Sequence, residues 1–272
     1  MFSLGGGEII VILLVALKLP VPAAIFADLL FLGTYVWWTL GGGPPKRLQS
    51  VRADYFRVRP LSPRQWAWGL LAAISFAVTV HSAITFLFRF VPYPAAAFHQ
   101  GYDLSYIPTR LLQYLACIIS ALSAGVCEEI GFRGYMQRPI EERHGAPLAI
   151  LVSSVLFTLL HLTKGWALPG MVPIVFGAGV LLGVLARAAG TLWFGIIGHW
   201  IMDIGLFLFW WTQVAGTFSE RPIGETGIDR AFIWEAGIFC AALLVVLAAI
   251  TRLLKMRDEG PSSALPRMGA TV

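Results

Sequence analysis

Seven stretches of this sequence are long and apolar enough to cross a lipid bilayer, and no other feature constrains the fold as strongly. A helix needs about 20 residues to span a hydrocarbon layer of roughly 30 Å. Apolar residues make up 57% of the chain and charged residues only 13%, a composition that excludes a soluble domain of this size. The sequence therefore predicts an all-α, polytopic transmembrane bundle of about seven helices. The expected spans are residues 21–40, 65–91, 109–137, 146–163, 170–189, 191–212 and 231–254.

An apolar run at residues 8–19 leaves an eighth span open. Pro20 separates it from the next segment, and about 12 residues are short for a crossing. Without a preceding basic region, the run does not resemble a signal peptide. Residues 1–20 therefore either cross the membrane or lie at its surface.

The basic residues mark the topology of the chain. Residues 41–64 carry six Lys or Arg side chains against one acid, Asp54, and the tail after residue 254 is also basic. The positive-inside rule places both segments in the cytoplasm, and the six spans between them return the chain to the same side. Because these charges do not form one soluble basic face, we expect no nucleic-acid partner. The small size and short loops suit a bacterial inner membrane, if the source is prokaryotic.

The spans and linkers divide the chain into five parts. Ser62, Pro63 and Gln65 form the pattern of a capping box, so we expect a helix to begin there. Without an internal repeat, a transporter built on inverted repeats is disfavoured. The five parts are membrane segments with a basic linker (1–64), a transmembrane helix with an external loop (65–107), a four-helix membrane core (108–212), an external loop with the last transmembrane helix (213–254) and a disordered tail (255–272).

A pair of glutamates followed by an arginine lies within the third expected span. Ionisable residues in lipid cost several kcal/mol unless they are paired or hydrated, so their positions point to function. Glu129 and Arg133 are one helical turn apart and can form an ion pair, whereas Glu128 faces about 100° away and is available as a general base. The alternative is a charge cluster at the cytoplasmic end of the helix.

Two further pairs of residues have the same spacing of one helical turn. Phe157 and His161 lie on a helix without other charges, and a histidine there is either a packing residue or a catalyst. His199 and Asp203 share one face of a later span, where the carboxylate can orient the imidazole. The alternative for this second pair is a buried polar contact that holds helices together.

The helical rise predicts whether the three groups can meet. Glu128 lies roughly 15 Å and His199 roughly 13 Å from the cytoplasmic edge, so these two residues are level. His161 lies at roughly 20 Å, so its helix must tilt or begin in the aqueous phase for a single site to form.

Taken in order, the motifs EEIGFR, FTLLH and HWIMD resemble the signature of the CPBP intramembrane protease family. This family includes the Rce1-type CAAX prenyl endopeptidases and their bacterial Abi-type relatives, and the resemblance covers about residues 120–207. It implies an intramembrane endopeptidase in which Glu128 activates a water and His161 and His199 bind the oxyanion. Asp203 would support these residues. Glu129, Arg133 and Phe157 would hold the geometry.

The resemblance leaves the use of a metal open. Many members carry asparagine where this chain has Asp203. The extra negative charge of the aspartate favours the binding of a cation or raises the basicity of nearby groups. One carboxylate and two imidazoles provide an activated water and oxyanion donors without any cofactor. Zinc or another divalent cation remains the alternative, with Glu128, His161, His199 and Asp203 as ligands, although no H-E-x-x-H motif is present.

The resemblance also implies a partner. It predicts a membrane-associated peptide or lipid-anchored protein as the substrate, and a cavity open to the cytoplasm would supply water. Two other functions remain open: a transporter or proton-coupled channel that uses the same residues, and a non-catalytic binding or immunity protein on the same scaffold.

Overall fold

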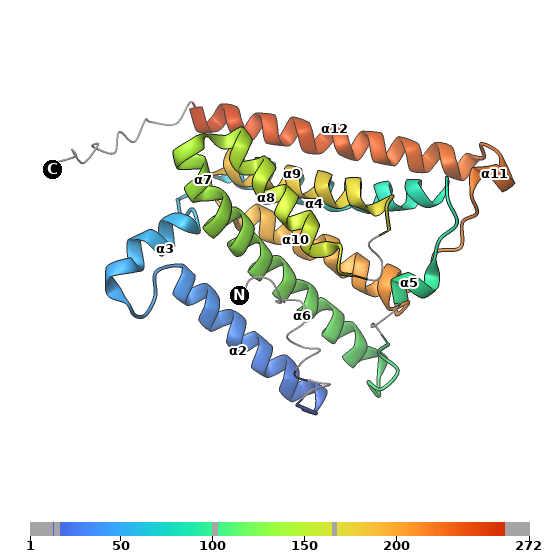
Figure 1. Cartoon of the computed structure of the whole chain (residues 1–272), viewed down its shortest axis with the longest axis horizontal. Coiled ribbons are helices and arrows are strands. Elements are labelled where there is room, and N and C mark those ends of the chain that lie inside the picture. Colours follow the sequence, from blue (N-terminus) through green and yellow to red (C-terminus); the bar gives the residue numbers. More distant parts are fainter. Residues whose placement is uncertain (1–12, 14–16, 100–102, 165–167, 259–272) are drawn as a thin grey trace.

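A computed structural model describes residues 13, 17–99, 103–164 and 168–258, and the described part of the chain is helical without strands (Figure 1). Six helices are long and apolar enough to cross a membrane, and a shorter apolar helix spans Ala146–His161. The predicted all-α, polytopic membrane bundle is therefore confirmed, and each of the seven expected stretches overlaps one of these helices. The possible eighth span at residues 8–19 falls mostly outside the described residues.

Each expected span matches a helix or a chain of helices that continue one another. The long helix from Arg110 to His144 combines α6, the π-helical η5 and α7, and η6 continues α10 in the same way. The described elements are α2 (Val21–Thr39), η4 (Lys46–Leu48), α3 (Gln49–Tyr55), α4 (Pro63–Phe88), α5 (Ala95–His99), α6 (Arg110–Glu129), η5 (Ile130–Met136), α7 (Gln137–His144), α8 (Ala146–His161), α9 (Met171–Ala189), α10 (Trp193–Gly205), η6 (Leu206–Trp211), α11 (Ile223–Thr226) and α12 (Arg230–Asp258).

The ends of two helices test the boundaries read from the sequence. The hydroxyl of Ser62 accepts a hydrogen bond from the backbone N–H of Gln65, whose side chain accepts one from the N–H of Ser62, so the predicted capping box starts α4. The last helix runs four residues further than expected, to Asp258. Residues 255–258 are therefore helical, and the rest of the predicted disordered tail lies outside the described residues.

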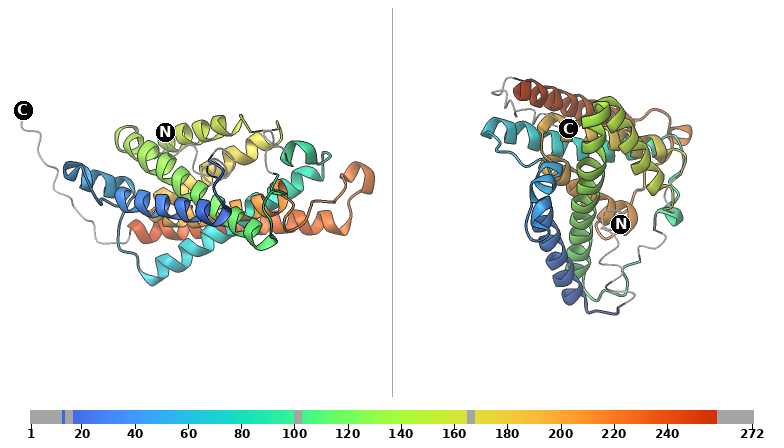
Figure 2. Two further views of the ribbon diagram at one scale, coloured as in Figure 1. Left: turned by 90° about the horizontal axis from the view of Figure 1, so that it is seen from below. Right: turned by 60° about the vertical axis from the view of Figure 1, so that its left-hand side comes forward.

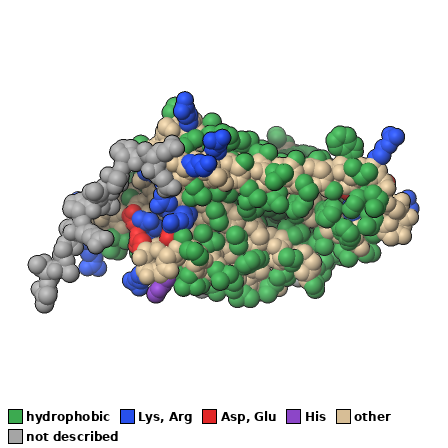
Figure 3. Space-filling model, turned by 90° about the horizontal axis from the view of Figure 1, so that it is seen from above, with side chains coloured by type: hydrophobic (Ala, Val, Ile, Leu, Met, Phe, Trp, Pro, Cys, Tyr) green, Lys and Arg blue, Asp and Glu red, His purple; other side chains and the backbone are tan. Residues whose placement is uncertain are grey.

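Apolar side chains cover the outside of the bundle. Figure 3 shows one face on which hydrophobic side chains are spread over the whole length between the ends, while most Lys, Arg, Asp and Glu side chains on that face gather at one end. Leu30, Leu111, Trp234 and Leu244 are among the exposed large hydrophobic residues. Such a surface is stable only in lipid, and the chain is an integral, multi-pass membrane protein.

Helices α4, α6, α9, α10 and α12 pack closely against one another, whereas α2 contacts mainly α6. Helix α12 lies along α4 and α9, α10 packs between α4 and α6, and α2 lies at the periphery against α6 (Figure 1 and Figure 2). At the end of α4, the buried guanidinium of Arg89 binds Asp229 at 2.7 Å and Glu235 at 3.3 Å. These ion pairs connect the end of α4 to the start of α12 and to the loop before it, at the end of the bundle opposite the basic linker.

Gly145 places the first two candidate residues at the same level. It adopts a positive φ of 84° and joins α7 to α8 as the turn of a helical hairpin. Glu128 precedes this turn by 17 residues and His161 follows it by 16. The expectation that His161 lies deeper is wrong, because the helix of Glu128 does not end near Arg138 but continues to His144.

Close contact between α4 and α10 yields a first prediction. A Cβ atom added at Gly69 would lie 2.2 Å from two ring atoms of Phe194, a buried side chain that cannot move freely. Gly69→Ala should therefore destabilise the protein by roughly 1–3 kcal/mol. Gly177→Ala, with no atom within 4 Å of the added Cβ, should be neutral or stabilising by up to about 1 kcal/mol. Unfolding in detergent measures both variants, and equal stabilities would contradict this packing.

Candidate active site

Three helices bring the four candidate residues together. Glu128 lies near the end of α6, His161 is the last residue of α8, and His199 and Asp203 lie one turn apart on α10. The Oε2 atom of Glu128 is 3.8 Å from the Nε2 atom of His161 and 3.8 Å from the Nε2 atom of His199. The Oδ2 atom of Asp203 is 3.5 Å from the same Nε2 atom of His199. The predicted residues therefore form one polar cluster inside the bundle.

The Oε2 atom of Glu128 is the central atom of this cluster. It is buried and has no hydrogen-bond partner in the described part of the chain. A separation of 3.8 Å from each imidazole is too long for a direct hydrogen bond but suits a bridging water. One small molecule in this space could contact the carboxylate and both imidazoles.

Hydrogen bonds fix the orientation of each imidazole through its other nitrogen. The Nδ1 atom of His161 lies 2.7 Å from the carbonyl oxygen of Phe157, and the Nδ1 atom of His199 lies 3.0 Å from Oε1 of Glu129. Both oxygens accept hydrogen bonds, so Nδ1 is the donor in each case. The two Nε2 atoms are thereby directed toward Glu128.

Glu129 has a second partner that the sequence spacing did not reveal. Its Oε1 atom accepts a hydrogen bond from Nη1 of Arg133 at 2.9 Å, as predicted, and also contacts His199 on α10. Gly195 makes this approach possible, because a Cβ atom there would lie 2.8 Å from Oε2 of Glu129. The sequence predicts contacts along one helix, whereas this contact depends on how α10 packs against α6.

Arg133 and Phe157 contact the residues of the site and the neighbouring helix α9. Nη2 of Arg133 donates to the carbonyl oxygen of Gly179 at 3.1 Å, and its guanidinium lies 4.5 Å from the ring centre of Phe157. The ring of Phe157 lies 4.4 Å from the ring of His161 and 6.0 Å from the ring of His199. The arginine thus ties α9 to the site, and the phenylalanine limits the motion of both imidazoles.

A cavity of about 100 Å³ adjoins the cluster, enough for several waters. Its lining on α10 and η6 runs from His199 to Trp211, away from the basic linker, so the cavity extends toward the opposite end of the bundle. The expected opening to the cytoplasm stays a prediction. Toward the basic end, the side chain of Gln137 on α7 donates a hydrogen bond to the carbonyl oxygen of Gly183 on α9 at 3.0 Å. Apolar lining residues include Val80, Ile84, Met171, Ile174 and Leu206.

The four residues offer the nitrogen and oxygen donors that zinc uses. However, no three His, Cys, Asp or Glu side chains of the described residues converge closely enough to hold a metal ion as they stand.

The fold and the site define a polytopic membrane protein with carboxylates and imidazoles gathered inside its helical bundle. Residues 110–205 match the family described as Type II CAAX prenyl endopeptidase Rce1-like. The predicted resemblance to the Rce1-type endopeptidases is confirmed over this segment, which contains all four candidate residues. The family is a family of proteases. No curated protein and no solved structure matches the chain significantly.

Proposed function

We propose that this protein is an intramembrane endopeptidase that hydrolyses a peptide bond by means of a water activated by Glu128. The observation that carries the proposal is the position of the buried Oε2 atom of Glu128, 3.8 Å from the Nε2 atoms of both His161 and His199. A carboxylate in this position can take a proton from a bound water, and groups facing it can stabilise the oxyanion.

The reaction can be written with these residues alone. The water oxygen attacks the carbonyl carbon of the scissile bond while Glu128 accepts a proton. A protonated Nε2–H of His161 or His199 donates a hydrogen bond to the developing oxyanion, and Asp203 supports the charge on His199. Collapse of the tetrahedral intermediate breaks the C–N bond, and the proton held by Glu128 passes to the leaving amine.

The cavity favours a membrane-associated or lipid-anchored substrate. Its walls are largely apolar and lie within the spans, so a soluble polar chain would lose its hydration on entering. An extended apolar segment, or a peptide next to a lipid anchor, would keep its apolar part in contact with apolar side chains. Cleavage of the CAAX type is the specific form of this proposal.

The test measures product formation by the purified protein in detergent. The substrates are labelled peptides with and without a prenylated cysteine, and each assay is run with and without EDTA. Specific cleavage that survives chelation supports the water mechanism, whereas loss on chelation with rescue by zinc would replace it with a metal-dependent protease. A folded protein that cleaves none of these peptides but conducts ions after reconstitution would instead support the transport alternative.

A further inference from the structure

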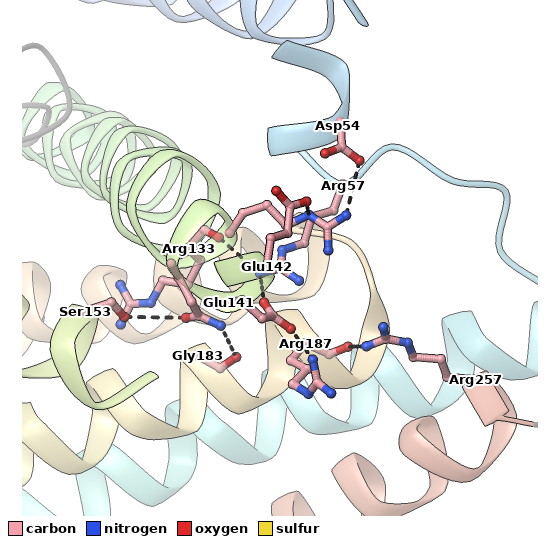
Figure 4. Close-up of polar contacts among 11 residues, drawn as sticks. Asp54, Arg57, Arg133, Glu141, Glu142, Ser153, Gly183, Arg187 and Arg257 are labelled. Atoms are coloured by element: carbon pink, nitrogen blue, oxygen red, sulfur yellow. Dashed lines mark hydrogen bonds and ion pairs between the residues drawn. The ribbon is translucent and has the colours of Figure 1, made fainter. Parts of the chain in front are cut away.

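A second charged cluster lies at the basic end of the bundle (Figure 4). The carboxylate of Glu141 on α7 binds two arginines from other elements. These are Arg57 in the linker before α4, at 2.5 Å, and Arg187 on α9. Arg257 on α12 donates to the carbonyl oxygen of Arg187 at 2.6 Å. Three segments distant in sequence thus meet around one glutamate.

Positive charge exceeds negative charge in this cluster. Glu141 is the acid shared by Arg57 and Arg187, and Arg257 adds a further cation. Arg59 lies beside the same end of α9, next to Gly190, three residues after Arg187. The adjacent Arg138 is already paired with Asp54 and Glu142, whose side chains are about half exposed.

Arg59 is the arginine near this cluster with two buried nitrogen atoms that lack a hydrogen-bond acceptor among the described residues. Its Nε and Nη2 atoms are buried and make no hydrogen bond within the described residues. The Nε atom lies close to Gly190, at the end of α9, where an added Cβ would approach it to 3.1 Å. Buried guanidinium nitrogens without hydrogen bonds are costly. The positive-inside rule does not require this burial, because exposed arginines satisfy it equally well.

The cluster lies at one end of the bundle, beside the ends of three of its helices. It surrounds the basic ends of α7, α9 and α12, and tryptophans are present at the same end, with Trp66 packed edge-on against Phe194 and Trp193 against Phe56. Tryptophans at helix ends are typical of the interface between lipid and water. Planar guanidinium groups at this level match phosphate oxygens by paired hydrogen bonds.

We propose that Arg59 and Arg257, beside the Arg57–Glu141–Arg187 cluster, form a binding site for a phosphate group at the basic end of the bundle. The phosphate of an anionic lipid headgroup and a soluble phosphate share the chemistry that the site recognises. The proposal does not depend on the proteolytic activity, because the site is separate from Glu128.

The test is lipid retention by the purified full chain, measured by native mass spectrometry in a neutral detergent. Phosphatidylglycerol is compared with phosphatidylcholine of the same acyl chains, and inorganic phosphate serves as the soluble competitor. We expect the wild type to retain phosphatidylglycerol more tightly, and Arg59→Gln to weaken this retention by about tenfold. Arg64→Gln is the matched control, because Arg64 is exposed and lies in the first turn of α4, five residues after Arg59.

Each outcome decides the proposal. Equal retention of the two lipids by the wild type, or equal effects of Arg59→Gln and Arg64→Gln, would overturn it. Displacement of phosphatidylglycerol by millimolar phosphate, dependent on Arg59, would support the site and identify its ligand as a soluble anion. Arg257→Gln provides a second variant if Arg59→Gln does not fold, and thermal unfolding of each variant verifies folding independently of binding.

Discussion

Replacing Glu128 with glutamine should slow peptide cleavage by about 10²- to 10⁴-fold, the usual contribution of a general base. Glutamine has nearly the same shape as glutamate but cannot accept a proton from water at neutral pH. Because the Oε2 atom of Glu128 has no hydrogen-bond partner in the described chain, the substitution removes the base without breaking a direct contact of that atom. Cleavage assays under single-turnover conditions measure the effect.

A matched control separates this loss from a general effect of removing a carboxylate. Glu142 lies on the continuation of the same long helix, beyond the basic end of the site, and binds Arg138 at 3.0 Å on the surface. Glu142→Gln should leave the cleavage rate unchanged. A Glu128→Gln variant that folds like the wild type and cleaves at more than a tenth of its rate would exclude Glu128 as the base.

Replacing Arg133 with methionine should destabilise the protein by about 3–5 kcal/mol, because it leaves a buried carboxylate without its cation. The side chains of Arg133 and Glu129 are both fully buried, and the arginine also binds the carbonyl oxygen of Gly179 on α9. Methionine has a similar length, so loss of the charge and hydrogen bonds dominates over loss of volume. Thermal and denaturant unfolding in detergent measure the change.

Two further variants show whether the buried charge is the cause. Arg138→Met removes an arginine from two partly exposed ion pairs, with Asp54 and Glu142, and should cost less than about 1 kcal/mol. Combining Arg133→Met with Glu129→Gln removes both buried charges and should recover part of the lost stability. Equal stabilities of Arg133→Met and Arg138→Met would show that the buried pair does not hold α6, η5 and α9 together.

Much of the fold followed from short-range patterns. Stretches of about 20 apolar residues specify membrane helices because the backbone must satisfy its own hydrogen bonds in lipid. The capping box at Ser62 and the ion pair of Glu129 with Arg133 follow from spacings within a single turn. The length of the helix beyond Arg138 was missed, because its last residues are polar and leave the apolar pattern while remaining helical.

The sequence by itself determined which side chains share a helix face, since residues four apart in a helix lie one above the other. This was sufficient to nominate Glu128, His161, His199 and Asp203 as candidates. Only the tertiary structure decided that Glu129 also binds His199, that the cavity extends away from the basic end, and that arginines from three segments gather near Glu141. These contacts join helices distant in the chain, so they depend on packing between helices, which the spacing within one helix does not determine.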